Sequence, residues 1–492
     1  METPTKNFER KYQIPILLAG LALAVVCLYV LVARVYFRAG FPLDDAWIHQ
    51  SYARSLAQTG RWEFIPGQPS AGGSTSPLWT ALLALGRLVG FNFYAWTYLL
   101  GAVFLWATAC LAEMTVRHKL SAYNPKIPWV GILFTLEWHL AWAAASGMET
   151  ILQIFLVMLF FSLLFSFPQR TYLLGLVVGL GMWVRPDSLT LLGPLLLVGS
   201  FGVRSWRGWF KDILRVVTGF ALPAALYLLF NLAVAGSLMP NTFYAKQTEY
   251  ADLLLTPLYR RFFEQSLQPL TGVGLLLLPL VLIHAWQAVI KRDWSFLAAV
   301  AWLLGYLALY ALRLPVTYQH GRYAMPVIPL LLFLGSLGAA QWLASQAGKF
   351  ISLRLAWKVS TGLLLVIFLG IGAWSFARDV AFIENDMVAP AQWVAANLPP
   401  QALVAAHDIG ALGYFGAHHL VDLAGLISPE VIPFMRDQAG LARFLDEQQV
   451  SYLVTFPGWY PELVRGKTVV FSAQPGLNQG YGSEHMHIYR WR

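Results

Sequence analysis

Charged residues are scarce in this chain. Asp, Glu, Lys and Arg make up 12% of the 492 residues, while hydrophobic residues make up 58%. A soluble globular domain usually has about 25% charged residues, so this composition excludes an ordinary soluble protein. Aromatic residues are abundant instead, with 20 Trp and 21 Tyr, and both side chains favour the membrane–water interface. The sequence therefore predicts a polytopic membrane protein.

Cysteine is almost absent as well. Cys27 and Cys110 both lie inside apolar runs, which excludes a disulfide-stapled fold. There is no internal repeat, and the two halves do not resemble each other, so an inverted-repeat transporter is not favoured. The first apolar run, 14–36, is too long for the core of a signal peptide and has no small-residue cleavage site. We therefore interpret it as a retained membrane anchor.

A spanning helix needs roughly 20 apolar residues, and the pattern predicts about eleven such helices. The expected spans are 14–37, 79–114, 127–145, 150–167, 172–184, 189–203, 213–235, 272–290, 294–312, 324–344 and 357–376. The stretch 79–114 is too long for one straight helix and is broken at 90–93. We expect a short helix after Pro77, followed by one full crossing.

The net charge of +9 does not indicate a nucleic-acid partner, because the basic residues lie in short loops between the apolar runs. The positive-inside rule places these loops and the N-terminus in the cytoplasm of a cell-membrane protein. The basic clusters lie within 6–11, 117–126, 204–215, 291–292 and 349–358. The segments expected on the outer side are 41–76, 146–150, 185–187, 236–271, 314–322 and the C-terminal tail.

From about residue 378 the composition becomes more polar, and short buried strands alternate with helices. Strands are expected at 402–407 and 451–456, and helices at 389–397 and 439–448. The fold class is therefore an all-α polytopic membrane domain, 1–377, with an outer juxtamembrane loop at 41–76. A small extracytoplasmic α/β domain follows it, 378–492.

The outer segments gather acids and bases at one membrane face. An acid there can accept the proton of an attacking hydroxyl, and Arg and Lys can neutralise a leaving phosphate. The polar residues concerned are Asp44, Asp45, His49, Arg54, Glu149, Arg185, Asp187, Lys246, Glu249, Arg260, Arg261, Gln319, His320, Arg322 and Tyr323.

Each of these residues also has a structural interpretation. Asp44 is placed to cap the helix that begins at Asp45, and Asp45 and His49 are spaced to pair on one helical face. Neighbouring residues on a helix point about 100° apart, so both acids are not expected to serve one reacting atom. Ser146 and Glu149 match the spacing of a capping box at the start of a helix.

Three other features also favour structural roles. Asp187 or Ser188 is placed to cap the following span, while Arg185 neutralises it. The glycines of 410–416 do not match a dinucleotide fingerprint and are better explained by turn geometry. The tail histidines, 418–419, have no regularly spaced ligand partners, so no metal site is expected there.

A series of sequence blocks follows one order along most of the chain. They are DDAWIHQSYARSLAQTG (44–60), IPGQPSAGGSTSPLW (65–79), SGMET (146–150), RPDS (185–188), GSLMPNTFYAK (236–246), GRYAMPVIPLL (321–331) and HDIGALGYF (407–415). Together these blocks resemble the GT-C superfamily of integral-membrane glycosyltransferases. More narrowly, they are similar to bacterial enzymes related to mycobacterial arabinofuranosyltransferases.

The resemblance implies a polyprenyl-phosphate sugar donor in a membrane-level cavity, and inversion at the anomeric carbon by a single displacement. It implies an acidic base at the head of the first outer loop, which is Asp44 here, with Asp45 as the runner-up. Arg322 and Lys246 match the family's basic positions and are expected to bind the donor phosphate. The secondary candidates for that phosphate are His320 and Arg54.

Glu149 matches the family's second acidic position and is expected to orient substrate hydroxyls, together with His49, Tyr244 and Tyr323. The chain has RPDS where relatives often have RPEG, which weakens a specific role for Asp187. It also lacks a WWDYG-type block, which argues against an oligosaccharyltransferase with peptide acceptors.

We therefore expect an inverting glycosyltransferase that moves a sugar from a polyprenyl phosphate to a hydroxyl of an envelope glycan, lipid or protein. No metal or other cofactor is required, because Lys and Arg can neutralise the phosphate. A divalent ion near Asp44 and Asp45 is nevertheless compatible with the sequence. Two alternatives stay open. One is a lipid or sugar transporter or flippase, for which charged residues near the middle of the membrane would be expected. The other is a non-catalytic envelope-assembly protein.

Overall fold

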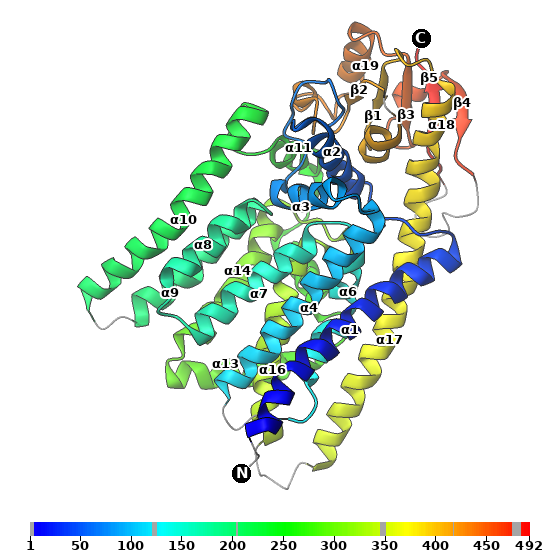
Figure 1. Ribbon diagram of the computed structural model, residues 1–492. Coiled ribbons are helices and arrows are strands. Elements are labelled where there is room, and N and C mark those ends of the chain that lie inside the picture. The colour runs from blue at the N-terminus through cyan, green and yellow to red at the C-terminus, as the bar shows by residue number, and fades with distance from the viewer. Residues whose placement is uncertain (1–3, 121–124, 203–204, 345–350, 417, 475–483) are drawn as a thin grey trace.

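The computed structural model describes residues 4–120, 125–202, 205–344, 351–416, 418–474 and 484–492. They form a helical bundle with one small sheet near the C-terminus (Figure 1). The helices are α1 (Pro4–Tyr36), α2 (Asp45–Thr59), α3 (Pro77–Leu88), α4 (Phe93–Lys119), α5 (Trp129–Leu136), α6 (Trp138–Ala145), α7 (Thr150–Ser166), α8 (Thr171–Met182), α9 (Leu192–Gly202), α10 (Trp206–Ala235), α11 (Asn241–Glu249), α12 (Leu258–Leu267), α13 (Gly274–Lys291), α14 (Trp294–Arg313), α15 (Tyr318–Gly321), α16 (Ile328–Ala344), α17 (Ile351–Ile383), α18 (Ala389–Asn397), α19 (Gln438–Glu447) and α20 (Pro461–Val464).

Among the described residues, 7 helical segments are long and apolar enough to cross a membrane. They are Gln13–Tyr36, Phe93–Lys119, Trp206–Ala235, Gly274–Lys291, Trp294–Arg313, Tyr318–Ala344 and Ile351–Asn397. Shorter apolar helices lie at Pro77–Leu88, Thr150–Ser166, Thr171–Met182 and Pro186–Phe201. The chain is therefore a multi-pass membrane protein, and the total of about eleven crossings stays a prediction.

Two predicted spans are interrupted. The break expected near Gly90 is present: α3 and α4 are separate helices, and Gly90 adopts a left-handed conformation (φ 79°). The segment 127–145, predicted as one span, is not one continuous helix, because the chain leaves the helix at Glu137 and forms α5 and α6. The Glu137 side chain accepts the N–H of Leu140 at 3.0 Å and so begins α6 as its cap.

The last membrane helix is much longer than the predicted span. Helix α17 continues through a π-helical turn (Glu384–Val388) into α18, so that one rod runs from Ile351 to Asn397. The predicted domain boundary at 377/378 lies inside this rod. The rod therefore connects the helical bundle to the C-terminal sheet without a flexible linker (Figure 1).

The C-terminal sheet is mixed, and its strand order is β2-β1-β3-β5-β4. Its strands are β1 (Val404–Ala406), β2 (Leu420–Asp422), β3 (Tyr452–Thr455), β4 (Thr468–Ser472) and β5 (His487–Arg490). The strands predicted at 402–407 and 451–456 are confirmed as β1 and β3, and the predicted helices as α18 and α19. Strands β2, β1 and β3 run parallel, so their carboxyl ends share one edge of the sheet.

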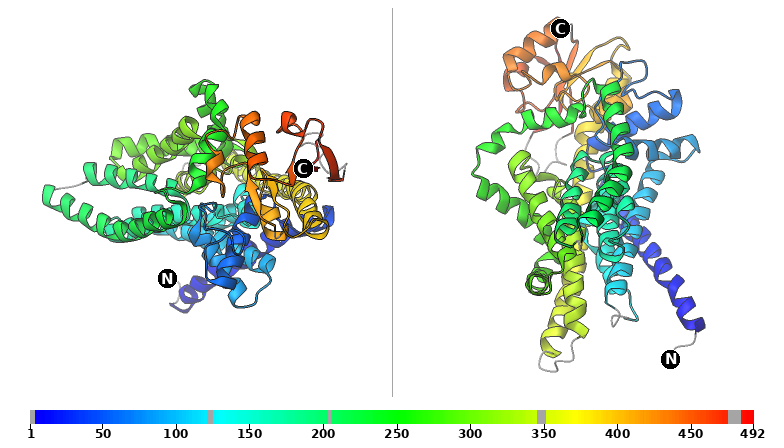
Figure 2. Two further views of the ribbon diagram at one scale, coloured as in Figure 1. Left: turned by 90° about the horizontal axis from the view of Figure 1, so that it is seen from above. Right: turned by 90° about the vertical axis from the view of Figure 1, so that its left-hand side faces the viewer.

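The sheet lies at the same end of the bundle as α2, α3 and α11 (Figure 1). Seen from above, it covers one side of the bundle, whereas α8, α9 and α10 extend to the other side (Figure 2). The segments expected on the outer side meet at this end, because Glu149, Lys246 and Arg322 all pair with α2 residues. The C-terminal end of β1 also reaches this region, because His407, which follows β1, pairs with Glu249 on α11.

Close packing of α4 against α6 gives a test of the bundle. A Cβ atom added at Gly101 would lie 1.8 Å from the carbonyl oxygen of Ala144. The Gly101→Ala variant must therefore push the two helices apart, and we expect it to lose about 1–3 kcal/mol of stability. The measurement is thermal unfolding in detergent. Gly20→Ala is the matched control, since its Cβ meets nothing within 4 Å; equal melting of the two variants would contradict this packing.

Candidate active site

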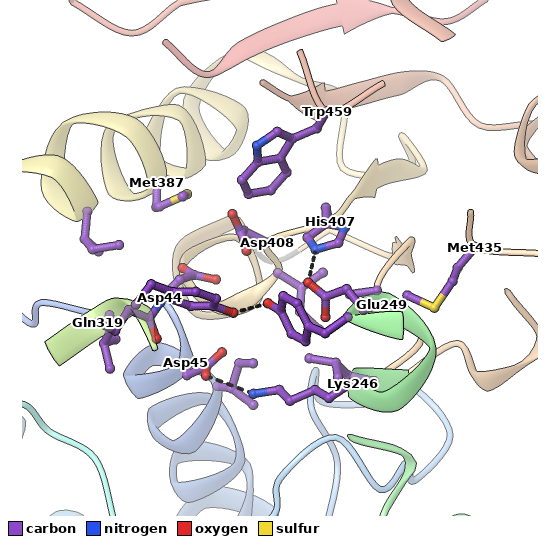
Figure 3. A pocket seen from close by; sticks show the side chains of 18 of the residues that line it. Asp44, Asp45, Lys246, Glu249, Gln319, Met387, His407, Asp408, Met435 and Trp459 are labelled. Atoms are coloured by element: carbon purple, nitrogen blue, oxygen red, sulfur yellow. Dashed lines mark hydrogen bonds and ion pairs between the residues drawn. The ribbon is translucent and has the colours of Figure 1, made fainter. Parts of the chain in front are cut away.

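Three charged side chains from distant parts of the chain meet at one point. Asp45 is the first residue of α2, Lys246 lies on α11, and Arg322 follows α15. One oxygen of Asp45, Oδ2, accepts from Arg322 Nη2 at 2.6 Å. The same oxygen accepts from Lys246 Nζ at 3.5 Å (Figure 3). The exposed fraction of the Asp45 side chain is 30%, against 6% for Arg322, so the acid faces an open space while the guanidinium is buried.

The backbone before Arg322 fixes the position of its side chain. Gln319, His320 and Gly321 have consecutive positive φ values of 54°, 58° and 63°. For a non-glycine residue this conformation costs roughly 1–2 kcal/mol, so the surrounding packing must hold it in place.

The Arg322 guanidinium has binding capacity left over. Its Nη2 also donates to the hydroxyl of Tyr323 at 3.2 Å, and Lys246 Nζ donates to the same hydroxyl at 2.9 Å. Arg322 Nε and Nη1 are buried and have no hydrogen-bond partner within the described part of the chain. Buried donors without acceptors are costly, and an anionic ligand would satisfy them.

Burial alone would raise the pKa of Asp45, but Lys246 and Arg322 hold it well below its usual range. Asp45 is therefore ionised while these two cations face it. In return, the pKa of Lys246 is raised despite its burial, because the Asp45 carboxylate lies beside it.

A second cluster lies directly beside the first. His49 Nε2 is 3.1 Å from Glu149 Oε2, and Arg185 Nη1 is 3.7 Å from Glu149 Oε1. Arg185 also pairs with Asp187 at 3.1 Å, and Tyr306 donates to Asp187 at 2.8 Å. The sequence prediction that Arg185 neutralises the acid of this turn is thus confirmed.

The capping interpretations are wrong for both acids. Glu149 makes no side-chain cap bond, since its carboxylate is taken by His49 and Arg185. Asp44 precedes α2 but makes no cap bond to it. Its two oxygens instead accept the N–H groups of Gly410 and Ala411, at 2.6 and 2.8 Å.

Asp44 and Arg54 hold opposite ends of one helical turn in the C-terminal domain. This turn, 410–416, begins at the N–H groups that bind Asp44. Arg54 donates to the carbonyls of Tyr414 (2.6 Å) and Gly413 (3.0 Å) at its other end. An acid at the N-terminus and a base at the C-terminus both complement the dipole of the turn. The environment of Asp44 also changes its proton affinity. Burial and the nearby Asp408 carboxyl raise its pKa, the N–H groups of Ala411 and Gly410 lower it, and the net result is a pKa of about 8.

Three predicted site residues lie elsewhere. Arg54 is used by the turn just described. His320 Nε2 pairs with Asp379 Oδ2 at 2.7 Å, and its ring lies against Trp142, away from the cavities described below. Tyr244 is 42% exposed on α11 and does not line these cavities either.

Two cavities meet at the Asp45 cluster. The first, of about 660 Å³, lies between the bundle and the C-terminal domain, and the second, of about 570 Å³, lies within the bundle. Both are lined by Asp45, Lys246 and Arg322. Asp44 lines only the first cavity, whereas His49, Glu149, Arg185 and Tyr323 line only the second. Both cavities therefore border the Asp45 cluster.

The wall of the first cavity contains residues that the sequence did not indicate as a site. His407 and Asp408 follow β1, and Trp459 and Tyr460 follow β3. Glu249, one of the outer polar residues that the sequence did point to, ends α11 and lies in the same wall. His407 Nε2 is 3.4 Å from Glu249 Oε1 (Figure 3). One signal in the sequence could have indicated this wall. Asp408 directly follows the strand expected at 402–407, and ligands of α/β sheets bind at the carboxyl ends of strands.

No group of three or more His, Cys, Asp or Glu residues in the described part of the chain is arranged to hold a metal ion. Around Asp45 the counter-charges are Arg322 and Lys246. The chemistry that this arrangement offers is therefore neutralisation of an anion by fixed cations, next to an ionised carboxylate.

Known proteins resemble this chain in fold. The crystal structure of ArnT from Cupriavidus metallidurans bound to undecaprenyl phosphate matches it with a TM-score of 0.58 at 13% identity, over 97% of this chain and 98% of that one. The oligosaccharyltransferase of Archaeoglobus fulgidus in its apo form matches with a TM-score of 0.56 at 10% identity, over 88% of this chain and 69% of that one.

The arabinofuranosyltransferase AftD from Mycobacteria matches with a TM-score of 0.51 at 17% identity, over 95% of this chain but 39% of that one. Residues 379–489 match a family described as "Domain of unknown function (DUF8728)". No curated protein sequence matches the chain. The helical bundle, its C-terminal domain and these structural likenesses together show that the chain has the GT-C fold of membrane glycosyltransferases.

Proposed function

We propose that the protein is an inverting glycosyltransferase that moves a sugar from a polyprenyl phosphate to an acceptor hydroxyl at the outer face of the cell membrane. The observation that carries this proposal is the Arg322 guanidinium, which lines both cavities and has two buried donors without a partner among the described residues. The fold supports it, because one protein with this fold binds undecaprenyl phosphate.

The second cavity suits the donor. Its wall contains apolar side chains, including Phe243, Leu309 and Leu314, which can contact a polyprenyl chain. Lys246 and Arg322 line this cavity as well as the first one. A phosphate placed on them would leave the attached sugar beside Asp45.

We assign the base to Asp45 rather than to Asp44, which the sequence favoured. Asp45 lines both cavities, so it can contact an acceptor hydroxyl and lie beside the donor sugar. Both oxygens of Asp44 are engaged by backbone N–H groups, and protonation would weaken those bonds. Asp44 then serves to dock the C-terminal domain.

Donor binding would itself prepare Asp45. Before binding, Arg322 and Lys246 lower its pKa and make it a weak base. A phosphate that takes over these two cations would release the carboxylate and raise its proton affinity. The base would then become active only when the donor is present.

The reaction is a single displacement. The acceptor oxygen forms a bond to the anomeric carbon while the bond from that carbon to the phosphate oxygen breaks. The hydroxyl proton passes to Asp45, and the electrons of the broken bond leave with polyprenyl phosphate. Arg322 and Lys246 neutralise the charge that develops on this leaving group.

Asp45→Asn tests the base. We expect turnover to fall by about 10²–10⁴-fold, because the amide cannot accept the proton. The assay follows release of polyprenyl phosphate from labelled polyprenyl-phosphate sugars in membranes, with undecaprenyl phosphate binding as a second readout that should persist. Turnover at the wild-type level from a well-expressed variant would overturn the assignment.

Asp44→Asn separates docking from catalysis. We expect faster hydrogen–deuterium exchange at 410–416, because an amide can accept only one of the two N–H bonds well. Turnover should stay within about tenfold of wild type, since no proton transfer is lost. If this variant instead loses turnover while its exchange pattern is unchanged, Asp44 is the base.

Arg322→Gln tests the phosphate site. Loss of a charge-assisted bond worth about 1.5–3 kcal/mol should raise the donor KM roughly 10- to 100-fold. Inhibition by undecaprenyl phosphate should weaken in parallel. Arg260→Gln is the matched control, because Arg260 is an exposed cation that pairs with Glu264 on its own helix. Equal donor KM values for the two variants would exclude Arg322 from the site.

A further inference from the structure

The first cavity is closed on one side by the carboxyl edge of the C-terminal sheet. His407 and Asp408 follow β1, Leu426 lies beyond β2, and Trp459 and Tyr460 follow β3, and all of them line this cavity. The strand order places β2 on one side of β1 and β3 on the other. Ligands of α/β sheets bind outside the carboxyl ends at such a reversal of strand order. The edge that faces Asp45 therefore lies in the position where sheets of this kind bind their ligands.

An aromatic ring lies over this edge. Trp459 is 46% exposed although it lines the cavity, and Figure 3 shows its ring above Asp408. The rings of His407 and Phe456 support it, at centroid distances of 5.0 and 4.9 Å. A supported indole with an open face offers a flat apolar platform next to polar groups.

The polar groups beneath the ring are hydrogen-bond acceptors. Asp408 has no hydrogen-bond partner within the described part of the chain, and burial raises its pKa to about 6 despite the opposing effect of His407. His407 is held by Tyr460 (2.8 Å) and by Glu249 (3.4 Å). A ligand with several hydroxyl donors would satisfy Asp408.

The cations that the C-terminal domain contributes to this wall, His407 and Arg436, are paired. His407 pairs with Glu249, and Arg436 pairs with Asp252. The carboxylates of Asp45 and Glu249 also line the cavity, and despite burial neighbouring cations lower the pKa of both, so they are ionised. The wall therefore disfavours an anionic ligand.

A ring with an apolar face and hydroxyl edges matches this wall. We propose that the carboxyl edge of the C-terminal sheet is the acceptor subsite, that the acceptor is an uncharged sugar, and that Trp459 and Asp408 bind it. This inference rests on the proposed function. The sugar ring packs on the Trp459 indole, its hydroxyls donate to Asp408 and Glu249, and one hydroxyl points to Asp45.

Binding of neutral sugars tests the proposal without turnover. The full-length protein in nanodiscs is mixed with methyl glycosides of gluco-, manno-, galacto- and arabino-trisaccharides, and binding is followed by saturation-transfer NMR. We expect at least one trisaccharide to bind, and Trp459→Ala and Asp408→Asn each to weaken it by at least about fivefold. The matched controls are Trp206→Ala, which removes an indole 72% exposed on α10, and Glu430→Gln, which removes an exposed acid of the same domain.

The proposal is overturned if no neutral trisaccharide binds the wild-type protein, or if Trp459→Ala binds it as tightly as Trp206→Ala does. Its failure is distinguishable from failure of the proposed function. Transfer to a lipid or peptide acceptor with a KM that Trp459→Ala leaves unchanged contradicts only the acceptor subsite. Sugar binding that depends on Trp459, without release of polyprenyl phosphate from any donor, contradicts only the transferase.

Discussion

The ion cluster of Asp45, Lys246 and Arg322 is the interaction on which the site depends. Charges at the end of a membrane bundle are costly unless they are paired. Here the pairing joins the start of α2, the middle of α11 and the chain after α15. It also leaves two donors of Arg322 without a hydrogen-bond partner among the residues that the structure describes. The cluster is therefore stable without a ligand and still able to receive an anion.

The C-terminal domain is fixed to the bundle beside this cluster. Asp44 and Arg54 hold the two ends of the turn 410–416, and the rod from α17 to α18 reaches the sheet directly. Neighbouring acids at the head of α2 thus have different partners: Asp44 binds the C-terminal domain, and Asp45 binds the cations. This division is what adjacent positions on a helix predict, because their side chains point in different directions.

Much of the fold could be predicted from the sequence, because apolar run lengths and basic loops follow directly from membrane physics. The break at Gly90 and the strands β1 and β3 were predicted correctly. The interruption at Glu137 was not, because an acid inside an apolar run gives no sign that it will cap a new helix. The continuous rod through 384–388 was missed for a similar reason, since polar composition there suggested a domain boundary.

Part of the predicted set of site residues lies together, because the outer segments meet at one end of the bundle. Lys246, Arg322, Tyr323, His49 and Glu149 do gather at the cavities. His320 does not, because its left-handed backbone turns it toward Asp379 and Trp142. Asp408 and Trp459 were missed because their proximity to Asp45 depends on strand pairing and on the docking of a whole domain, neither of which spacing along the chain reveals.

The most direct test of the phosphate site is an electron cryo-microscopy structure of the protein in nanodiscs with undecaprenyl phosphate. The account predicts phosphate density within hydrogen-bond distance of Arg322 and Lys246, with the polyprenyl chain along the cavity wall that contains Phe243 and Leu309. Phosphate bound at Arg54 or at the exposed Arg260, with the Asp45 cluster unchanged, would contradict it.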